Sequence, residues 1–396
     1  PVFSVYDVEA GERSFRVQLE ARCRSDKADY SWKGVIEGDA DGTVRFSVTG
    51  RAEADFNSPR IGLCILYGAD ELTGISFDTV TMADDVISGE FTPAISAALA
   101  AADFHTLRYR TSSGLGVSTA IEGSRVDMED QRNYGDSSWK AYAPLPHSYD
   151  EIIAGAEAQQ TVTVTLSEVP AAAAAVDEND TLAIDLSQAC AADVVMPAHD
   201  PQCAGGPVFM AVNGTEAGAD GTLMWSFAPF NHMPDDDTLC ENVRALSDQI
   251  MTARAAAPAA EICICPITLN VPYTRTQVDP RISGDEAAVF LAASVRQAAI
   301  SGAASWGTDL GPGSADAVRG RLARLAGSPC RVLTLDHSLP RPDPVIAFVA
   351  APDTGDELWL CNLTAAEQAV EVRGLPPVRE SKCEWLAGRG GMGDTR

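Results

Sequence analysis

The pattern of apolar residues changes once along this chain, near residue 170, and the change constrains the fold more than any other feature. Before it, short stretches such as residues 43–56 and 159–166 alternate apolar and polar side chains between Gly, Asp and Ser turns. This period of two is typical of half-buried β-strands. Residues 1–168 therefore predict an antiparallel β-sandwich domain.

Two further stretches of this part also indicate strands. Residues 106–123 predict two strands around a Ser-Ser-Gly turn, and the continuous apolar run 60–68 predicts a strand buried on both faces. An alanine-rich stretch, residues 170–180, marks the domain boundary.

After the boundary, expected strands at residues 182–186, 207–212, 222–229 and 261–269 alternate with two expected helices. The helix at 238–257 has an apolar stripe, and Thr238 with Glu241 resembles a capping box. The helix at 283–301 begins with a second such pair, Ser283 and Glu286. Alternating strands and helices predict a parallel α/β fold for residues 169–313.

The last part, residues 314–396, predicts a helix followed by a small antiparallel β-domain. The helix covers residues 314–327, and the strands cover 330–335, 345–351, 357–363 and 368–375.

Composition excludes several classes of partner. Acidic residues outnumber basic ones by 56 to 29, and the net charge of −27 repels nucleic acid and anionic membranes. No apolar run reaches transmembrane length, so we expect a cytoplasmic protein. The ten cysteines lack the spacing of a zinc site. We therefore expect reduced cysteines, no metal and no cofactor.

Polar residues follow the expected strands of the α/β part, where such folds place their chemistry. Glu216 and Asp309 form a candidate carboxylate pair for acid and base catalysis on a sugar. Asn231, His232 and Arg275 are candidates for substrate binding. Each also has an ordinary reading, as a turn former, a loop residue or a surface cation, and the acids at 235–237 fit a helix N-cap.

The stretch 128–140, "MEDQRNYGDSSWK", combines five charges with Gln, Asn, Tyr and Trp. It is either a charged turn of the β-domain or a loop that orders the site. In the second case Arg132 is a substrate-binding candidate, paired with Glu129, Asp130 or Asp136, because a dense mixed-charge cluster needs internal pairing.

These stretches resemble the bacterial D-apionate lactonase family. The resemblance is carried by residues 32–46, 55–67 and 128–145, and by later patches such as "ICPITLNVPYTR" and "GAASWGTDLGPG". It implies a β-domain, a TIM-like (β/α) barrel and a small C-terminal β-domain. Residues 169–313 are about half of the ~250 residues of a complete barrel, so the barrel is expected to be shortened, with several βα units either lost from the protein or omitted from the sequence given. An open barrel exposes strand edges, which makes a homo-oligomer an expectation.

The resemblance implies a hydrolase that opens a sugar-acid lactone, D-apionolactone, to the acid. Glu216 is then the base, His232 or Arg275 stabilises the oxyanion, and Asp309 assists the leaving alkoxide or binds a hydroxyl. Two alternatives stay open. One is a glycoside hydrolase using Glu216 and Asp309, and the other is a non-catalytic carbohydrate-binding or assembly protein.

Overall fold

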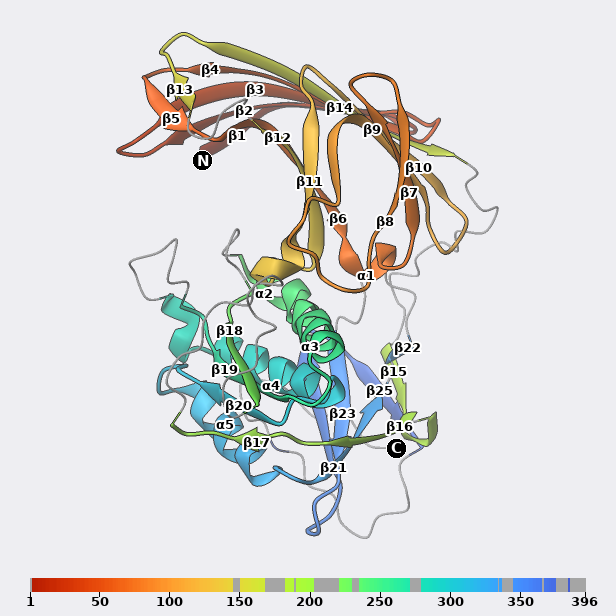
Figure 1. Ribbon diagram of the computed structural model, residues 1–396, viewed down its shortest axis with the longest axis vertical. Coiled ribbons are helices and arrows are strands. Elements are labelled where there is room, and N and C mark those ends of the chain that lie inside the picture. Colours follow the sequence, from red (N-terminus) through yellow and green to blue (C-terminus); the bar gives the residue numbers. More distant parts are fainter. Residues whose placement is uncertain are drawn as a thin grey trace. The chain divides into compact units, whose positions relative to one another are not determined.

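The computed structural model (Figure 1) shows a chain of two compact units. The first unit comprises Pro1–Asp130 and Ser138–Ala174, and the second comprises Gln131–Ser137 and Ala175–Arg396. The short segment Gln131–Ser137 therefore belongs to the second unit, although it lies within the first in sequence. The structure describes residues 2–144, 150–167, 182–188, 190–202, 221–229, 235–270, 279–333, 335–336, 345–364, 367–374 and 384.

In the first unit, twelve described strands form one continuous sheet. Its order is β1-β2-β3-β4-β14-β10-β9-β11-β12-β6, with β7 paired to β9 and β8 paired to β7, and β5 and β13 form a separate ribbon. All of its strand pairs are antiparallel, as the sequence predicts. The strands are β1 (Val2–Ala10), β2 (Phe15–Arg24), β3 (Asp29–Gly38), β4 (Thr43–Ala52), β5 (Phe56–Ser58), β6 (Arg60–Gly68), β7 (Ser76–Thr81), β8 (Val86–Glu90), β9 (Ala101–Arg110), β10 (Gly116–Glu122), β11 (Val126–Asp130), β12 (Ser138–Pro144), β13 (Asp150–Ile152) and β14 (Glu157–Ser167).

The core of this unit lies under strands β6 to β14 and one short helix, α1 (Ala69–Leu72). Phe91, Phe104, Leu107 and Trp139 are almost fully buried there. The prediction that β6 is buried on both faces is wrong. It is the last strand of the sheet, and alternate residues such as Leu66, which is 61% exposed, face solvent.

The second unit contains the parallel sheet that the alternating pattern predicts. Its order is β17-β20-β19-β18, and all three strand pairs are parallel. The strands are β17 (Ala198–His199), β18 (Thr222–Phe227), β19 (Glu261–Ile267) and β20 (Ser305–Thr308). Helix α3 (Ala245–Ala256) connects β18 to β19, and α4 (Asp285–Ile300) connects β19 to β20.

Within the described residues this sheet is open, so the expected TIM-like barrel is not seen as a closed barrel. The strand expected at 182–186 lies outside the parallel sheet. It forms β15 (Leu182–Asp185), which pairs with β22 (Leu335–Asp336) and β25 (Val370–Arg373). Its apolar side chains, Leu182 and Ile184, are buried in the core of that small sheet. The strand expected at 207–212 lies outside the described residues.

The two expected helices form, but their first turns differ from the prediction. The first begins two residues earlier, as α2 (Asp236–Glu241), and continues through a 3-10 turn, η3 (Asn242–Arg244), into α3. Helix α4 begins at Asp285 after Gly284, because residues 280–283 form the 3-10 turn η4 (Pro280–Ser283). The predicted apolar stripe is confirmed, since all four of its members are buried: Leu239, Val243, Leu246 and Ile250.

Asp235 caps α2, in agreement with the N-cap reading of the acidic run. Its carboxylate accepts from the Thr238 backbone N–H and hydroxyl, both at 2.8 Å. Partial burial alone would raise the pKa of Asp235, but these hydrogen bonds lower it below its ordinary value.

We expect Asp235→Ala to destabilise the second unit by about 1 kcal/mol at neutral pH, because a helix N–H loses its acceptor. The folded pKa of Asp235 lies below the unfolded one, so this stability is present above about pH 4 and is lost as the pH falls through the folded pKa. Urea unfolding at pH 7 and pH 3 measures both effects. Asp235→Ser keeps an acceptor without a charge and should stay near the wild type; a loss equal to that of Ala would contradict the cap.

Helix α4 also contacts the strands of the C-terminal part. Arg296 is buried and donates from Nε to the Ala347 carbonyl at 3.1 Å. Ala347 lies on β23 (Val345–Ala350), in the antiparallel sheet β16-β21-β23-β24. The other strands are β16 (Cys190–Val195), β21 (Pro329–Leu333) and β24 (Glu357–Asn362), and the predicted helix of this part is α5 (Ser314–Arg324).

Six cysteines in the described residues do not form disulfides: Cys23, Cys64, Cys240, Cys263, Cys330 and Cys361. Cys265 is disulfide-bonded, so the expectation of reduced cysteines is wrong at this position. None of the described helices has the length and apolar character that crossing a bilayer requires.

Candidate functional site

The carboxyl ends of β18, β19 and β20 lie at one edge of the parallel sheet. Phe227 pairs with Ile267, and Ile267 pairs with Thr308, so the three strands end level with one another. The Thr308 hydroxyl donates to the Ile267 carbonyl at 2.7 Å and accepts from the Leu310 N–H at 3.1 Å. These bonds fix the turn that carries Asp309.

Asp309 and Asn270 come together at this edge. Asn270 Nδ2 donates to Asp309 Oδ2 at 3.2 Å, and the Asn270 N–H donates to the Thr268 hydroxyl at 2.9 Å. Asp309 is exposed and Asn270 is half-buried. The pair therefore presents a carboxylate, oriented by an amide, to molecules that approach from solvent. Such a pair can accept hydrogen bonds from sugar hydroxyls.

Strand β17 adds an aromatic pair beside β20. His199 lies opposite Trp306 in the register, and their ring centroids are 4.5 Å apart. Burial, followed by the Arg319 guanidinium, lowers the pKa of His199 below its ordinary value, so the ring is neutral at pH 7. Asp200 follows His199 at the carboxyl end of the strand, and its N–H donates to the Trp306 carbonyl at 2.8 Å. It is a second described carboxylate at the end of a parallel strand.

The segment Gln131–Ser137 packs on α3 through a buried polar network. Arg132, in the 3-10 turn η1 (Gln131–Tyr134), has no exposed side-chain surface, and its Nη1 donates to Asp248 Oδ2 at 3.1 Å. The Arg132 carbonyl accepts from Gln249 Nε2 at 2.8 Å. Gln249 Oε1 in turn accepts from the Trp225 indole N–H at 2.9 Å. The network thus connects this segment to the middle of β18.

A second set of bonds holds the same segment at the carboxyl end of β18. Asn242 Nδ2 donates to Asp136 Oδ1 at 3.0 Å and to the Pro229 carbonyl at 2.5 Å, and Asn242 Oδ1 accepts from the Ser137 N–H at 2.7 Å. Gly135 has a φ of +85°, and a side chain there would meet the Ala228 carbonyl at 3.1 Å. Glycine is therefore required at this close approach. The segment lies beside the strand end that the sequence places at the site.

Of the site residues predicted from sequence, the structure describes Arg132 and Asp309. It places Arg132 under α3 and Asp309 beside Asn270. The remaining four lie outside the described residues: Glu216, Asn231, His232 and Arg275.

Sequence reasoning missed the partners of both described residues. Asn270 is the first residue after the strand expected at 261–269, and this position at a strand end is the signal that could have selected it. Asn242 and Gln249 lie seven residues apart on the buried side of one helical segment. Two amides beside an apolar stripe indicate buried polar partners, because amides are rarely buried without them.

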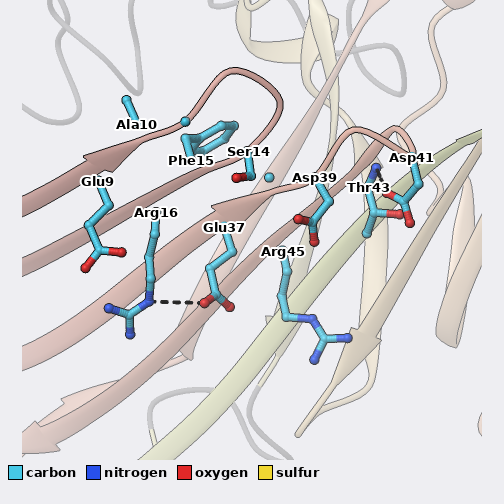
Figure 2. Close-up of a pocket in the computed structure, with 12 residues that line it drawn as sticks. Glu9, Ala10, Ser14, Phe15, Arg16, Glu37, Asp39, Asp41, Thr43 and Arg45 are labelled. Atoms are coloured by element: carbon cyan, nitrogen blue, oxygen red, sulfur yellow. Dashed lines mark hydrogen bonds and ion pairs between the residues drawn. The ribbon is translucent and has the colours of Figure 1, made fainter.

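The structure also has a cavity of about 610 Å³ on the first unit, far in sequence from these residues (Figure 2). It lies over the ends of β1–β4, and a row of alternating charges crosses it from Glu9 through Arg16 and Glu37 to Arg45. Arg16 Nε donates to Glu37 at 3.1 Å. Opposite charges on neighbouring strands stabilise a sheet, so this row has a structural explanation.

Comparisons with known proteins assign both ends of the chain to domains of one kind of protein. Residues 1–169 match the model of the D-apionate lactonase N-terminal domain, and residues 342–395 match that of the D-apionate lactonase C-terminal immunoglobulin-like domain. D-apionate lactonase of Brucella anthropi is 26% identical over 174 residues. That match covers 42% of this chain and 28% of the relative, so the chain spans little more than a quarter of the relative's length.

Two solved structures share a weaker likeness. A putative aldose 1-epimerase of Escherichia coli K12 has 10% identity and a TM-score of 0.27, over 42% of this chain and 69% of that one. Galactose 1-epimerase of Lactobacillus acidophilus NCFM has 8% identity and a TM-score of 0.26, over 42% and 65%. Both TM-scores lie below 0.5, so the assignment rests on the sequence matches.

The chain is thus a multidomain protein with an antiparallel β-sheet domain at its N-terminus and an immunoglobulin-like domain at its C-terminus. Both terminal domains match domains of D-apionate lactonase, which confirms the resemblance read from the sequence.

Proposed function

We propose that this protein hydrolyses a sugar-acid lactone, with D-apionolactone as the substrate that the family match suggests. The observation that carries the proposal is the Asn270–Asp309 pair at the carboxyl edge of the parallel sheet. An exposed carboxylate beside an amide suits a polyhydroxylated ligand, because both groups form directional hydrogen bonds with hydroxyls.

The proposed reaction has three steps. Water attacks the lactone carbonyl carbon while Glu216 takes its proton, and the carbonyl oxygen becomes an oxyanion that His232 or Arg275 stabilises. The carbonyl then re-forms as its bond to the ring oxygen breaks, and the released alkoxide takes up a proton. Asp309 assists this departure or holds a neighbouring hydroxyl. The roles of Glu216, His232 and Arg275 rest on the sequence and on the family match.

We assign Arg132 a positioning role. Its guanidinium is fully buried and engages Asp248, which favours support of the segment Gln131–Ser137 over contact with substrate. That segment borders the end of β18 through Asn242, so a shift of it would move one wall of the proposed site.

We also infer that the parallel sheet is an arc of a (β/α) barrel. The support is its strand order. Strands β18, β19 and β20 are consecutive neighbours, and β17, the first strand of the set in sequence, pairs with β20, the last. In a barrel of parallel strands, the first strand closes against the last.

Substrate class is tested by offering the pure protein a panel of aldonolactones and, separately, aryl glycosides. We expect acid release from lactones above the spontaneous rate, followed with a pH indicator, and no release of the aryl group. Turnover of glycosides without lactone opening would favour the alternative in which Glu216 and Asp309 act as a glycosidase pair.

We expect Asp309→Asn to lower kcat/KM for the lactone about tenfold or more, because a charged hydrogen-bond acceptor at the substrate is lost. Asp353→Asn is the matched control, since Asp353 is an exposed acid in a turn of the C-terminal part. Equal kcat/KM values for the two variants would place the site away from the Asn270–Asp309 pair.

A further inference from the structure

One face of the four-stranded region β1–β4 consists of apolar residues. In the strand register, Phe3 pairs with Ala21, Ala21 pairs with Trp32, and Val5 pairs with Leu19. A third row crosses all four strands and is likewise apolar: Val8, Val17, Ile36 and Phe46. The aromatic rings contact one another along this face, with centroids 6.0 Å apart for Phe3 and Trp32 and 6.2 Å apart for Trp32 and Phe46.

The opposite face of the same strands is charged. The row from Glu9 to Arg45 lies there, as Figure 2 shows. The register places Arg22, Glu20 and Lys33 on the same face in neighbouring rows. An antiparallel sheet with one charged and one apolar face is built to have the apolar face covered.

Among the residues that the structure describes, the cover is incomplete. The apolar face begins in the core, where Val162 of β14 pairs with Phe46 and is 7% exposed. It then opens toward the edge strand, where Phe3 is 58% exposed and Val5 and Val8 are each 61% exposed. Contiguous exposed apolar surface of this kind marks an interaction site.

The chemistry of the face indicates its occupant. Most of its side chains are those of Val, Leu, Ile, Ala, Phe and Trp. A sugar or a charged ligand needs more polar partners than these residues offer. The four strands have nine or ten residues each. At ~3.3 Å per residue and ~4.8 Å between strands, they give a flat area of roughly 600 Å². Two such areas together reach the low end of stable protein interfaces, about 1,200 Å².

We propose that this face packs against the same face of a second copy of the chain. The contact is isologous, because an apolar face without charges is complementary to itself. The two sheets pack face to face in the aligned manner of a β-sandwich.

Pairing of two β1 edges is disfavoured, since a bulge between Val5 and Asp7 interrupts the ladder of this strand. The net charge of −27 repels copies elsewhere on the surface, which leaves this uncharged face as the favoured contact. The proposal does not depend on the lactonase activity.

The test is sedimentation velocity of the full chain over a range of concentrations, with two matched variants on β1. Val5→Lys places a charge on the apolar face, whereas Ser4→Lys places the same charge on the opposite face of the same strand. Val5 is 61% exposed, so both variants should fold, as circular dichroism will verify. We expect a dimer for the wild type and for Ser4→Lys, and a dissociation constant raised at least ~10-fold for Val5→Lys.

Three outcomes would overturn the proposal. A wild-type protein that stays monomeric at ~100 μM leaves the face to another occupant. Equal dissociation constants for the two variants would place the dimer contact elsewhere. A loss of the dimer in both variants would indicate pairing along the β1 edge instead of packing of the faces.

Discussion

Replacing Glu216 by Gln is expected to lower the turnover of lactone hydrolysis at least ~100-fold, the low end of what a positioned general base contributes. The amide keeps the shape of the side chain but cannot take a proton from the attacking water. Steady-state rates measured with wild type and variant at equal active-protein concentration give the ratio, and circular dichroism verifies that the variant is folded.

Comparison with Asp309→Asn shows which of the two carboxylates, Glu216 or Asp309, acts as the general base. Asp309 is held by Asn270 and is proposed to bind or assist, so its loss should reduce kcat/KM without abolishing turnover. If Glu216→Gln keeps a near-normal rate and Asp309→Asn abolishes it, the two roles must be exchanged and Asp309 is the base.

The largest expected effect on stability belongs to Arg132→Met. Arg132 is fully buried, and its removal breaks the ion pair with the Asp248 carboxylate. Breaking a buried ion pair by removing one partner costs about 3–5 kcal/mol, and we expect the lower end because Asp248 keeps 27% exposure. Urea unfolding with Trp fluorescence measures the loss, since Trp225 is joined to Arg132 through Gln249.

Arg331→Met provides the control for this variant. Arg331 pairs with Asp356 at 3.1 Å in the same unit, but both side chains are exposed, so the expected loss is below about 1 kcal/mol. An Arg132→Met protein as stable as the control would show that the ion pair does not secure the segment Gln131–Ser137.

The periodicity of apolar residues predicted where the strands and helices lie better than it predicted which strands pair with one another. The strands β4, β9, β10 and β14 and the parallel sheet are found where the alternation indicates them, because burial of one face fixes the spacing of apolar residues. The edge position of β6 was missed, since an apolar run reads the same whether one face or both faces are covered. The pairing of β15 with β22 and β25 was missed because strand partners are set by contacts distant in sequence.

The candidate site shows the same division. The sequence indicated that Asp309 follows a parallel strand and that residues 128–140 are unusual in composition. It did not indicate which residues Asp309 and Arg132 contact. Arg132 pairs with Asp248, which lies 116 residues away, and no local pattern favours it over the nearer acids. Polar partners buried across elements depend on the packing of those elements, which composition and spacing do not encode.

The most direct test of the proposed function is ring opening of D-apionolactone by the wild type and by the Glu216→Gln/Asp309→Asn double variant, measured side by side against buffer. We predict acid release well above the spontaneous rate for the wild type and release at the spontaneous rate for the double variant. Equal release by the two proteins, or none above buffer from the wild type, would contradict the assignment of a lactonase site to this edge of the parallel sheet.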